Sequence, residues 1–347
     1  MILINNRIID HSQPCFVIAE AGVNHNGDLT LARKLIDVAI EAKADAVKFQ
    51  TFKAERLVCV SAKKANYQLE TTNPQESQLD MLRKLELTKQ QHIELIAYCK
   101  EKNILFLSTP FDEESADLLH ELNVPLFKIP SGEITNIPFL KHIAKKGKPM
   151  IVSTGMSCLA EVEKAIEAIE GEDNKAICLL HCVSNYPAKA EDVNLKAIST
   201  LLAAFSYPTG YSDHTLGIEI ALAACARGAC VIEKHFTLDK TMSGPDHRAS
   251  LEPKELKALI AGIRLIERAM GNGRKIPAPS ELNTAEVARK SIIASQHILP
   301  GEILSISHFI MKRPGTGLPP FMLQYILGKT VKYEISVGTI INFEMVT

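Results

Sequence analysis

Eight short β-rich runs, each followed by a stretch with helical spacing, constrain the fold of this 347-residue chain more than any other feature. The runs lie at residues 16–20, 46–50, 104–108, 126–129, 150–153, 177–181, 209–212 and 231–235. Amphipathic segments follow them, for example residues 29–44, 160–170 and 255–270. Strands that alternate with helices make right-handed crossovers and a parallel sheet buried on both faces.

The number of these units separates two α/β architectures. Eight units match a (β/α)8 barrel, which usually takes about 250 residues. A doubly wound open sheet is the alternative, but no G-x-G-x-x-G motif follows the first run, so a dinucleotide site lacks its usual fingerprint. We therefore predict an α/β protein with a (β/α)8 TIM barrel.

A second, smaller domain is predicted after the barrel. The segment GNGRKIPAPSE at 271–281 combines glycines and prolines that end a helix and begin a linker. Short β-rich pieces follow at 291–295, 330–335 and 339–343, separated by turn residues. We predict a barrel at 1–272, a linker at 273–286 and a β-rich domain at 287–347.

Composition excludes several classes of partner. With 46% apolar residues, 23% charged residues and a net charge of -1, the chain is an ordinary globular protein. It has no basic clusters, so we expect neither nucleic acid nor an anionic membrane as a partner. Arg7 and Asp10 interrupt the apolar N-terminus, and no apolar run approaches the roughly 18 residues that span a bilayer. These patterns predict a cytoplasmic protein.

The eight cysteines include no C-x-x-C pair, and most lie among apolar residues. We expect buried thiols rather than a cysteine metal site.

Polar side chains are concentrated where the eight runs end. The functional groups of a (β/α)8 barrel come from the C-terminal ends of its strands, so this concentration favours a site over simple surface turns. The residues singled out at these ends are Glu20, Lys48, Gln50, Thr109, Lys128, Ser131, Glu133, Ser153, Ser184, Tyr186, Asp213, His214 and His235.

His214 and His235 end the seventh and eighth runs, and barrel closure places Glu20 of the first run beside the eighth. Three adjacent strands then present two imidazoles and a carboxylate to one space. Imidazole suits a borderline divalent ion such as Mn, Co, Fe or Zn. With two histidines and no obligatory third ligand, we expect an exchangeable ion.

Lys48 and Lys128 lie on the second and fourth runs, opposite the histidines. Together with hydroxyls such as those of Thr109 and Ser153, they can hold a phosphate or carboxylate without a P-loop. An alternative is that Lys48 forms a Schiff base with a carbonyl substrate, as in an aldolase. That alternative needs a lysine with a lowered pKa.

Taken together, the strand ends resemble those of the bacterial N-acetylneuraminate (sialic acid) synthase family, which includes N,N'-diacetyllegionaminate synthase. The resemblance spans almost the whole chain. The matching segments are AEAGVNHNGD (19–28), VKFQTFKAERL (47–57), YQLETTNPQESQLDMLRKLEL (67–87), STPFD (108–112), KIPSGE (128–133), STGM (153–156), YSDHTLG (211–217), IEKHFTLDKTMSGPDHRASLEP (232–253) and KRPGTG (312–317).

The resemblance implies a TIM barrel followed by a small antifreeze-like (SAF) domain. It further implies a domain-swapped homodimer, in which Arg313 enters the partner subunit's active site to contact an amino sugar. Similar enzymes condense phosphoenolpyruvate with an N-acetylated mannose-type sugar and release phosphate, making a nine-carbon α-keto acid.

The resemblance also assigns roles to residues. Glu20 is the acid/base, assisted by Asp246, and His214 with His235 holds Mn2+, with Mg2+ or Co2+ as alternatives. Glu233 is expected to be structural, and His247 to belong to the loop scaffold. Phosphoenolpyruvate is held by Lys48, Thr109, Lys128, Ser131, Ser153, Ser184 and Tyr186. The sugar is held by Gln50, Glu133 and Arg313. At Ser184 some relatives have asparagine two residues before the tyrosine, but a hydroxyl still donates to phosphate.

Three hypotheses follow for function. The first is a phosphoenolpyruvate-dependent synthase, whose acceptor is N-acetylmannosamine or, as the alternative, 2,4-diacetamido-2,4,6-trideoxymannose. The second is a metal-independent Schiff-base pyruvate aldolase. The third is a non-catalytic binding protein, which leaves the two histidines and the glutamate on adjoining strands unexplained.

Overall fold

Eight parallel strands form the sheet of the N-terminal part of the chain, in a computed structural model that describes residues 1–73 and 75–347. The order of the strands in the sheet is β5-β4-β3-β10-β9-β8-β7-β6, and the end strands β5 and β6 also contact each other, which brings the sheet round into a barrel. The strands are β3 (Phe16–Gly22), β4 (Ala46–Thr51), β5 (Leu105–Pro110), β6 (Phe127–Ile129), β7 (Met150–Ser153), β8 (Ile177–Cys182), β9 (Thr209–Asp213) and β10 (Val231–His235). The predicted (β/α)8 barrel is confirmed.

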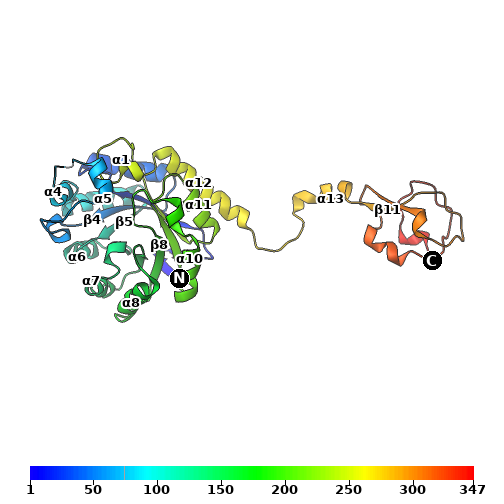
Figure 1. The fold of residues 1–347 in the computed structure, drawn as a ribbon, viewed down its shortest axis with the longest axis horizontal. Coiled ribbons are helices and arrows are strands. Elements are labelled where there is room, and N and C mark those ends of the chain that lie inside the picture. The colour runs from blue at the N-terminus through cyan, green and yellow to red at the C-terminus, as the bar shows by residue number, and fades with distance from the viewer. Residues whose placement is uncertain (74) are drawn as a thin grey trace. The chain divides into compact units, whose positions relative to one another are not determined.

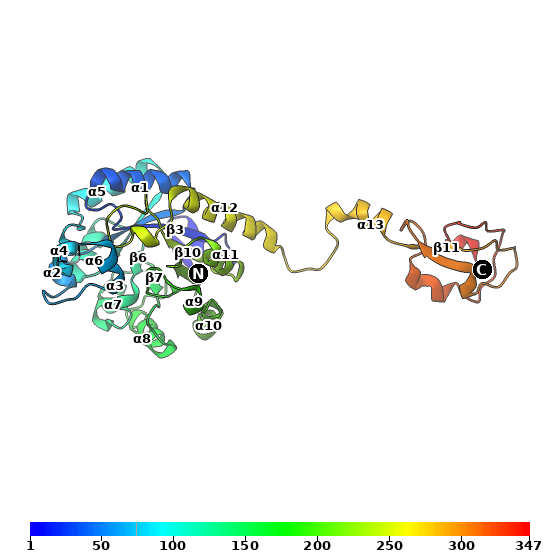
Figure 2. The same cartoon turned by 45° about the horizontal axis from the view of Figure 1, so that its top comes forward.

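Helices surround these strands (Figure 1), and the same ring is seen after a turn of 45° (Figure 2). They are α1 (Leu29–Glu41), α2 (Ala54–Leu57), α3 (Asn66–Thr71), α4 (Gln78–Arg83), α5 (Lys89–Glu101), α6 (Glu113–Glu121), α7 (Ile137–Ala144), α8 (Leu159–Glu170), α9 (Ala190–Val193), α10 (Lys196–Phe205), α11 (Glu219–Ala226) and α12 (Pro253–Met270). Local capping fixes where they start: the Asp28 carboxylate, for example, accepts a hydrogen bond from the backbone N–H of Thr30 at 2.6 Å. In the part of the chain that the structure describes, no helix is long and apolar enough to cross a membrane.

An N-terminal hairpin, not expected from the sequence, covers one end of the barrel. Its strands β1 (Ile2–Ile4) and β2 (Arg7–Ile9) pair in antiparallel fashion. Ile2, Ile4 and Ile9 are buried in one cluster with apolar side chains from the barrel strands, including Ile18 and Val231. Burial of this apolar surface closes the N-terminal end of the barrel, so the site must lie at the opposite end.

The period of two along each strand explains why that opposite end is polar. Ile18 belongs to the apolar cluster at the closed end, and Glu20, two residues later, lines a cavity at the other end. The same step separates Val231 from Glu233. The inward face of each strand therefore changes from an apolar layer to a charged layer within one strand length.

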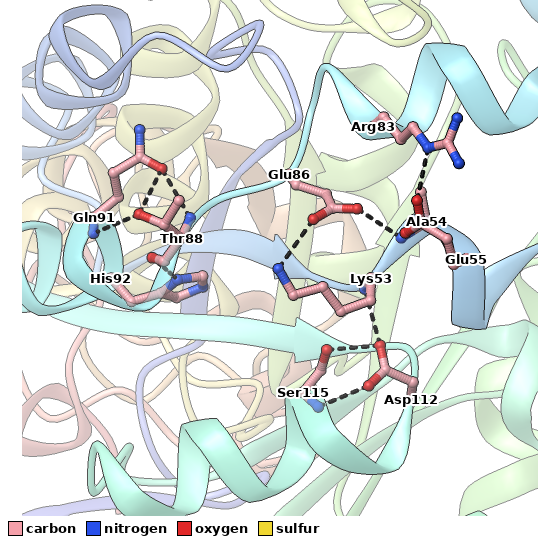
Figure 3. Close-up of polar contacts among 10 residues, drawn as sticks. All are labelled: Lys53, Ala54, Glu55, Arg83, Glu86, Thr88, Gln91, His92, Asp112 and Ser115. Carbon is pink, nitrogen blue, oxygen red and sulfur yellow. Dashed lines mark hydrogen bonds and ion pairs between the residues drawn. The ribbon is translucent and has the colours of Figure 1, made fainter.

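The segment between β4 and α5 is a long excursion that carries α2, α3 and α4 (Figure 3 shows its two ends). Its ends are tied together by Glu86, whose carboxylate accepts from the backbone N–H of Ala54 at 2.8 Å and from Lys53 Nζ at 3.0 Å. Asp112, after β5, accepts from the Lys53 backbone N–H at 3.1 Å. A capping box between Thr88 and the next turn then starts α5. These contacts hold the excursion against the C-terminal ends of β4 and β5.

The chain separates into two compact units, Met1–Gly271 and Asn272–Thr347. The second unit contains α13 (Leu282–Ala288) and an antiparallel pair, β11 (Ser291–Ala294) with β12 (Phe309–Lys312). The expected β-rich pieces at 330–335 and 339–343 take part only in isolated bridges, such as Ile293 with Ile340. These pieces are short and are bounded by turn glycines such as Gly338, so ladders do not extend along them. The unit has its own apolar core.

All eight cysteines are free thiols, and six of them are buried, as expected.

Candidate active site

A cavity of about 300 Å3 opens at the C-terminal end of the barrel. Residues from all eight strands or the loops after them surround it, as expected for a (β/α)8 barrel. The predicted site residues that line it are Glu20, Lys48, Gln50, Thr109, Lys128, Ser131, Ser153, Ser184, Tyr186, His214 and His235.

One side of this cavity carries two buried lysines, each held by a hydroxyl. Lys48 Nζ donates to Thr109 Oγ1 at 2.9 Å, and Lys128 Nζ donates to Ser153 Oγ at 2.7 Å. Both lysine side chains are only 4% exposed. Ammonium groups fixed in this way, with hydroxyls beside them, form a binding surface for a carboxylate or phosphate.

Ser131 and Ser184 meet at the same side of the cavity because a glycine lets them approach. The backbone N–H of Gly155 donates to Ser131 Oγ at 3.0 Å. A Cβ on Gly155 would lie 2.3 Å from Ser184 Oγ and 2.8 Å from Ser131 Oγ. Any larger residue at this position would push the two hydroxyls apart. Gly155 is therefore needed for Ser131 and Ser184 to lie together on the anion-binding side.

Two carboxylates lie beside the lysines and have opposite electrostatic environments. Lys48 Nζ is 2.7 Å from Glu20 Oε2 and 3.6 Å from Glu233 Oε2, whereas Lys128 Nζ is 3.5 Å from Glu233 Oε1. Burial, only partly offset by Lys48, raises the pKa of Glu20 to about 7. Burial also disfavours the charge on Glu233, but Lys128 and Lys48 outweigh it and lower the pKa of Glu233 to about 2. Glu20 can therefore exchange a proton near neutral pH, while Glu233 stays ionised.

The pKa values of the two lysines also shift in opposite directions. Burial disfavours the ammonium of Lys48, but Glu20 and Glu233 outweigh it, so the pKa of Lys48 is raised. Burial dominates at Lys128, and its pKa is lowered. A Schiff base needs an unprotonated amine. The aldolase hypothesis places the Schiff base on Lys48 or Lys128; the raised pKa of Lys48 disfavours this role, whereas the lowered pKa of Lys128 is compatible with it.

His214 and His235 face each other on adjacent strands, with ring centroids 5.6 Å apart. The parallel pairing of β10 with β3 sets His235 opposite Glu20, as the closed barrel predicts. His214 Nδ1 lies 2.7 Å from the carbonyl oxygen of Val183, so this nitrogen carries the proton and Nε2 is left to accept. Burial lowers the pKa of His214 to about 4, and burial together with His214 lowers the pKa of His235. Both imidazoles are therefore neutral at physiological pH.

These two histidines fit a weakly held divalent ion. Neutral imidazole is the form that ligates a metal, and His235 Nδ1 is buried without a hydrogen-bond partner among the described residues. Within residues 1–73 and 75–347, no group of three or more His, Cys, Asp or Glu side chains is arranged to hold a metal. A two-imidazole donor set leaves the remaining positions to water or substrate.

Asp246 lies near His235 at the entrance to a second cavity. Its carboxylate Oδ2 is 4.0 Å from His235 Nδ1, and burial raises the pKa of Asp246 to about 6. Gln50, Tyr186 and His235 line both cavities, so the second, of about 260 Å3, continues from the first. The Tyr186 ring lies 4.2 Å from His214 and 5.6 Å from His235, between centroids.

One predicted sugar-binding residue, Glu133, is not among the described residues that line these cavities. The Glu133 carboxylate accepts from Asn136 Nδ2 at 2.7 Å. Arg313 belongs to the second unit, where its Nε donates to the carbonyl of Ala288 at 3.1 Å. The role of Arg313 stays a prediction.

Glu233, expected from the sequence to be a supporting or structural carboxylate rather than a ligand, lines the cavity. The sequence can predict this position of Glu233. Residues two apart on a strand share a face, and His235 is among the predicted site residues. Tyr67, on α3, also lines the cavity, and its ring lies 5.3 Å from that of Tyr186. No local pattern could place Tyr67, because it lies on the excursion after β4.

Asp213, also among the strand-end residues, lies outside the cavity. It points to the other face of its strand, where Lys234 Nζ is 2.7 Å from its Oδ2. Alternation along β9 and β10 places these two residues on the helix side of the sheet. His247 belongs to the loop scaffold as expected, with Nδ1 2.6 Å from Thr237 Oγ1.

The fold and the cavity together define a (β/α)8-barrel enzyme with an anion-binding side, two neutral histidines and a carboxyl group that titrates near neutral pH. Comparison with known proteins identifies the family. The model of the NeuB family matches residues 35–275, and that of the SAF domain matches residues 289–347. The chain therefore belongs to the NeuB family, as the strand-end motifs indicated, and the predicted SAF domain is confirmed.

Individual relatives agree with this assignment. The chain is 56% identical to N,N'-diacetyllegionaminic acid synthase of Campylobacter jejuni over 90% of this chain and 94% of that protein. It is 48% identical to the protein of the same name from Legionella pneumophila, over 96% and 95%. The crystal structure of a sialic acid synthetase from Leptospira borgpetersenii, in complex with citrate, matches with a TM-score of 0.72 and 39% identity, over 82% and 95%. The chain is a synthase of this family.

Proposed function

We propose that this enzyme condenses phosphoenolpyruvate with 2,4-diacetamido-2,4,6-trideoxymannose and water, giving N,N'-diacetyllegionaminate and phosphate. The observation that carries the proposal is the division of one cavity into two sides. Lys48 and Lys128 with their hydroxyl partners suit the phosphate and carboxylate of phosphoenolpyruvate. His214 and His235 face this side and suit the aldehyde of the open-chain sugar. The names of the relatives from Campylobacter jejuni and Legionella pneumophila support this acceptor.

The proposed reaction forms one carbon–carbon bond, forms one carbon–oxygen bond to water and breaks the carbon–oxygen bond to phosphate. Carbon 3 of phosphoenolpyruvate attacks carbon 1 of the sugar aldehyde, and the aldehyde oxygen takes up a proton. Water then adds to carbon 2 of the former phosphoenolpyruvate and loses a proton. The resulting tetrahedral carbon expels phosphate while its hydroxyl loses a proton, and this forms the carbonyl of the α-keto acid.

Residues of the chain supply the proton transfers and the positioning. Glu20, with a pKa of about 7, is suited to accept the proton from the attacking water. Asp246, with a pKa of about 6 and close to His235, is suited to donate to the aldehyde oxygen. The ionised Glu233 keeps both lysines oriented and stabilises positive charge that develops at carbon 2.

His214 and His235 would hold a divalent ion, with Mn2+ first and Mg2+ or Co2+ as alternatives. When bound, such an ion acts as a Lewis acid toward the aldehyde oxygen. We also propose a homodimer in which Arg313 of one subunit reaches the sugar in its partner's site, and a cytoplasmic location. These proposals rest on the resemblance stated above and on the matched SAF domain.

The test is release of inorganic phosphate by the purified full-length protein. We expect release only when phosphoenolpyruvate, the acetamido sugar and a divalent metal are all present. Formation of product from pyruvate without metal, with a borohydride-trapped adduct on a lysine, would instead establish the aldolase. N-Acetylmannosamine is the second candidate acceptor, because the similar structure from Leptospira borgpetersenii is a sialic acid synthetase. Turnover of the two sugars side by side separates these candidates.

A further inference from the structure

The second cavity has a polar entrance and an apolar far wall. The residues that line both cavities, and so mark where they join, are Gln50, Tyr67, Phe111, Tyr186 and His235. Asp246 lines the second cavity, with its Oδ2 4.0 Å from His235 Nδ1. The other lining residues of this cavity include six aliphatic side chains, namely Val23, Leu57, Val58, Met81, Leu82 and Leu85. The reaction proposed above uses the entrance but gives no role to this wall.

Apart from Val23, which follows β3, the wall is built from the excursion after β4, and contacts within that excursion hold it together. Leu57 is the last residue of α2, while Met81 and Leu82 lie on α4. The Glu86 carboxylate caps the start of α2, and Arg83 Nε on α4 donates to Glu55 Oε1 on α2 at 2.6 Å. Figure 3 shows these contacts from Glu86 and Arg83 to the α2 segment. Leu57 and Leu82 are only partly buried and pack on the buried cluster of Val23, Phe52 and Leu85.

The direction in which the acceptor must extend points to this cavity. Phosphoenolpyruvate occupies the lysine side and attacks carbon 1, which lies at the histidines. The rest of the open-chain sugar must then run away from the lysines. His235 is the histidine that lines both cavities, so the space beyond it is the second cavity.

We propose that the second cavity receives carbons 4 to 6 of the acceptor, and that Leu57 and Leu82 select a methyl group at carbon 6 over a hydroxymethyl group. This inference rests on the proposed function. The 2,4-diacetamido-2,4,6-trideoxy sugar presents two methyl groups at this end, whereas N-acetylmannosamine presents hydroxyls. A hydroxyl that leaves water for an apolar wall loses hydrogen bonds without replacement. Gln68 and Gln78, which also line the cavity, offer amide groups to the acetamido substituent at carbon 4.

The size of the preference for a methyl group over a hydroxymethyl group is limited by how strongly an apolar wall can reject a hydroxyl. A hydrophobic pocket rejects an analogue that only adds a hydroxyl by about 100-fold at most. We therefore expect the substituent at carbon 6 alone to contribute about 10- to 100-fold in kcat/KM to the preference for the diacetamido sugar.

The experiment compares kcat/KM for the two sugars in the full-length enzyme, with saturating phosphoenolpyruvate and Mn2+ and with phosphate release as the readout. In Leu82→Gln, we expect the ratio of the two values to fall by about 10-fold, mainly through a higher KM for the diacetamido sugar. The KM for phosphoenolpyruvate should not change. Leu265→Gln is the matched control, because Leu265 is 58% exposed on α12, outside both cavities.

Each result bears on the inference. Leu57→Gln repeats the test on the other helix, and thermal unfolding of each variant shows whether it is folded. If both folded variants keep the wild-type ratio, or if the wild-type enzyme prefers N-acetylmannosamine, the assignment of the wall is overturned while phosphoenolpyruvate-dependent turnover still stands. If neither sugar supports phosphate release, the proposed function fails and this inference fails with it.

Discussion

Lys48→Met tests whether the buried ammonium of Lys48 offsets the free-energy cost of burying the Glu20 and Glu233 carboxylates in the folded protein. Lys48 Nζ lies 2.7 Å from Glu20 and 3.6 Å from Glu233, and its side chain is 4% exposed. Removal of one partner from a buried ion pair costs about 3–5 kcal/mol, because the remaining charge is left without compensation. A domain of this size loses about 2–4 °C of Tm per kcal/mol, so we expect Tm to fall by about 6–20 °C near neutral pH.

The fall in Tm of the Lys48→Met variant should depend on pH, and the direction of this dependence follows from the pKa of Glu20. The pKa of Glu20 is already raised to about 7 in the folded protein, and the loss of Lys48 raises it further. A carboxyl group with a raised folded-state pKa favours folding at low pH, and this contribution is lost as pH rises through that pKa. At low pH Glu20 is protonated, and Glu233 still has Lys128 at 3.5 Å. The deficit in Tm relative to wild type should therefore be smaller at about pH 5.5 than at about pH 8.

The assay is thermal unfolding of the wild-type and Lys48→Met proteins at both pH values, followed by circular dichroism. The double variant Glu20→Gln/Lys48→Met is the control, because it removes the carboxylate that the lysine compensates. It should recover most of the lost stability at the higher pH. Equal deficits at the two pH values, or no recovery in the double variant, would refute the electrostatic reasoning.

Three further experiments address the proposed chemistry. Glu20→Gln should lower kcat by about 10²- to 10⁴-fold with the fold intact by circular dichroism, whereas near-normal phosphate release would remove Glu20 from the mechanism. His214→Ala and His235→Ala should each weaken Mn2+ binding measured by calorimetry, and unchanged affinity in both would argue against a metal at this pair. Mixing Arg313→Ala with Glu20→Gln subunits should restore activity if Arg313 acts in the partner's site, because a hybrid dimer then contains one intact site. No recovery after subunit exchange would contradict the swapped arrangement.

Much of the barrel could be predicted because strand and helix patterns are local. The predicted run 150–153 and strand β7 (Met150–Ser153) have the same bounds, as do 231–235 and β10 (Val231–His235). The N-terminal hairpin was missed because its two strands have only three residues each, too few to show a period.

The assignment of site residues was most difficult within single strands. All five residues of β10 are buried, since a parallel sheet is covered on both faces. Burial and polarity therefore do not separate Glu233, which lines the cavity, from Lys234, which pairs with Asp213 on the other face. Only the two-residue spacing between Glu233 and His235 shows that Glu233 shares the cavity-facing side of the strand.

The alternation of strands and helices, and the residues that end each strand, follow from the amino-acid sequence. These properties depend on backbone periods of two and 3.6 residues, which are written in neighbouring positions. Which charged side chains meet depends instead on how the closed barrel brings its strands together. Lys48 and Glu233 are 185 positions apart and touch only because β4, β3 and β10 are consecutive in the closed sheet. The folded chain also brings Leu57 and Leu82 into the same cavity as His235, since a cavity wall depends on contacts between distant segments that no local pattern encodes.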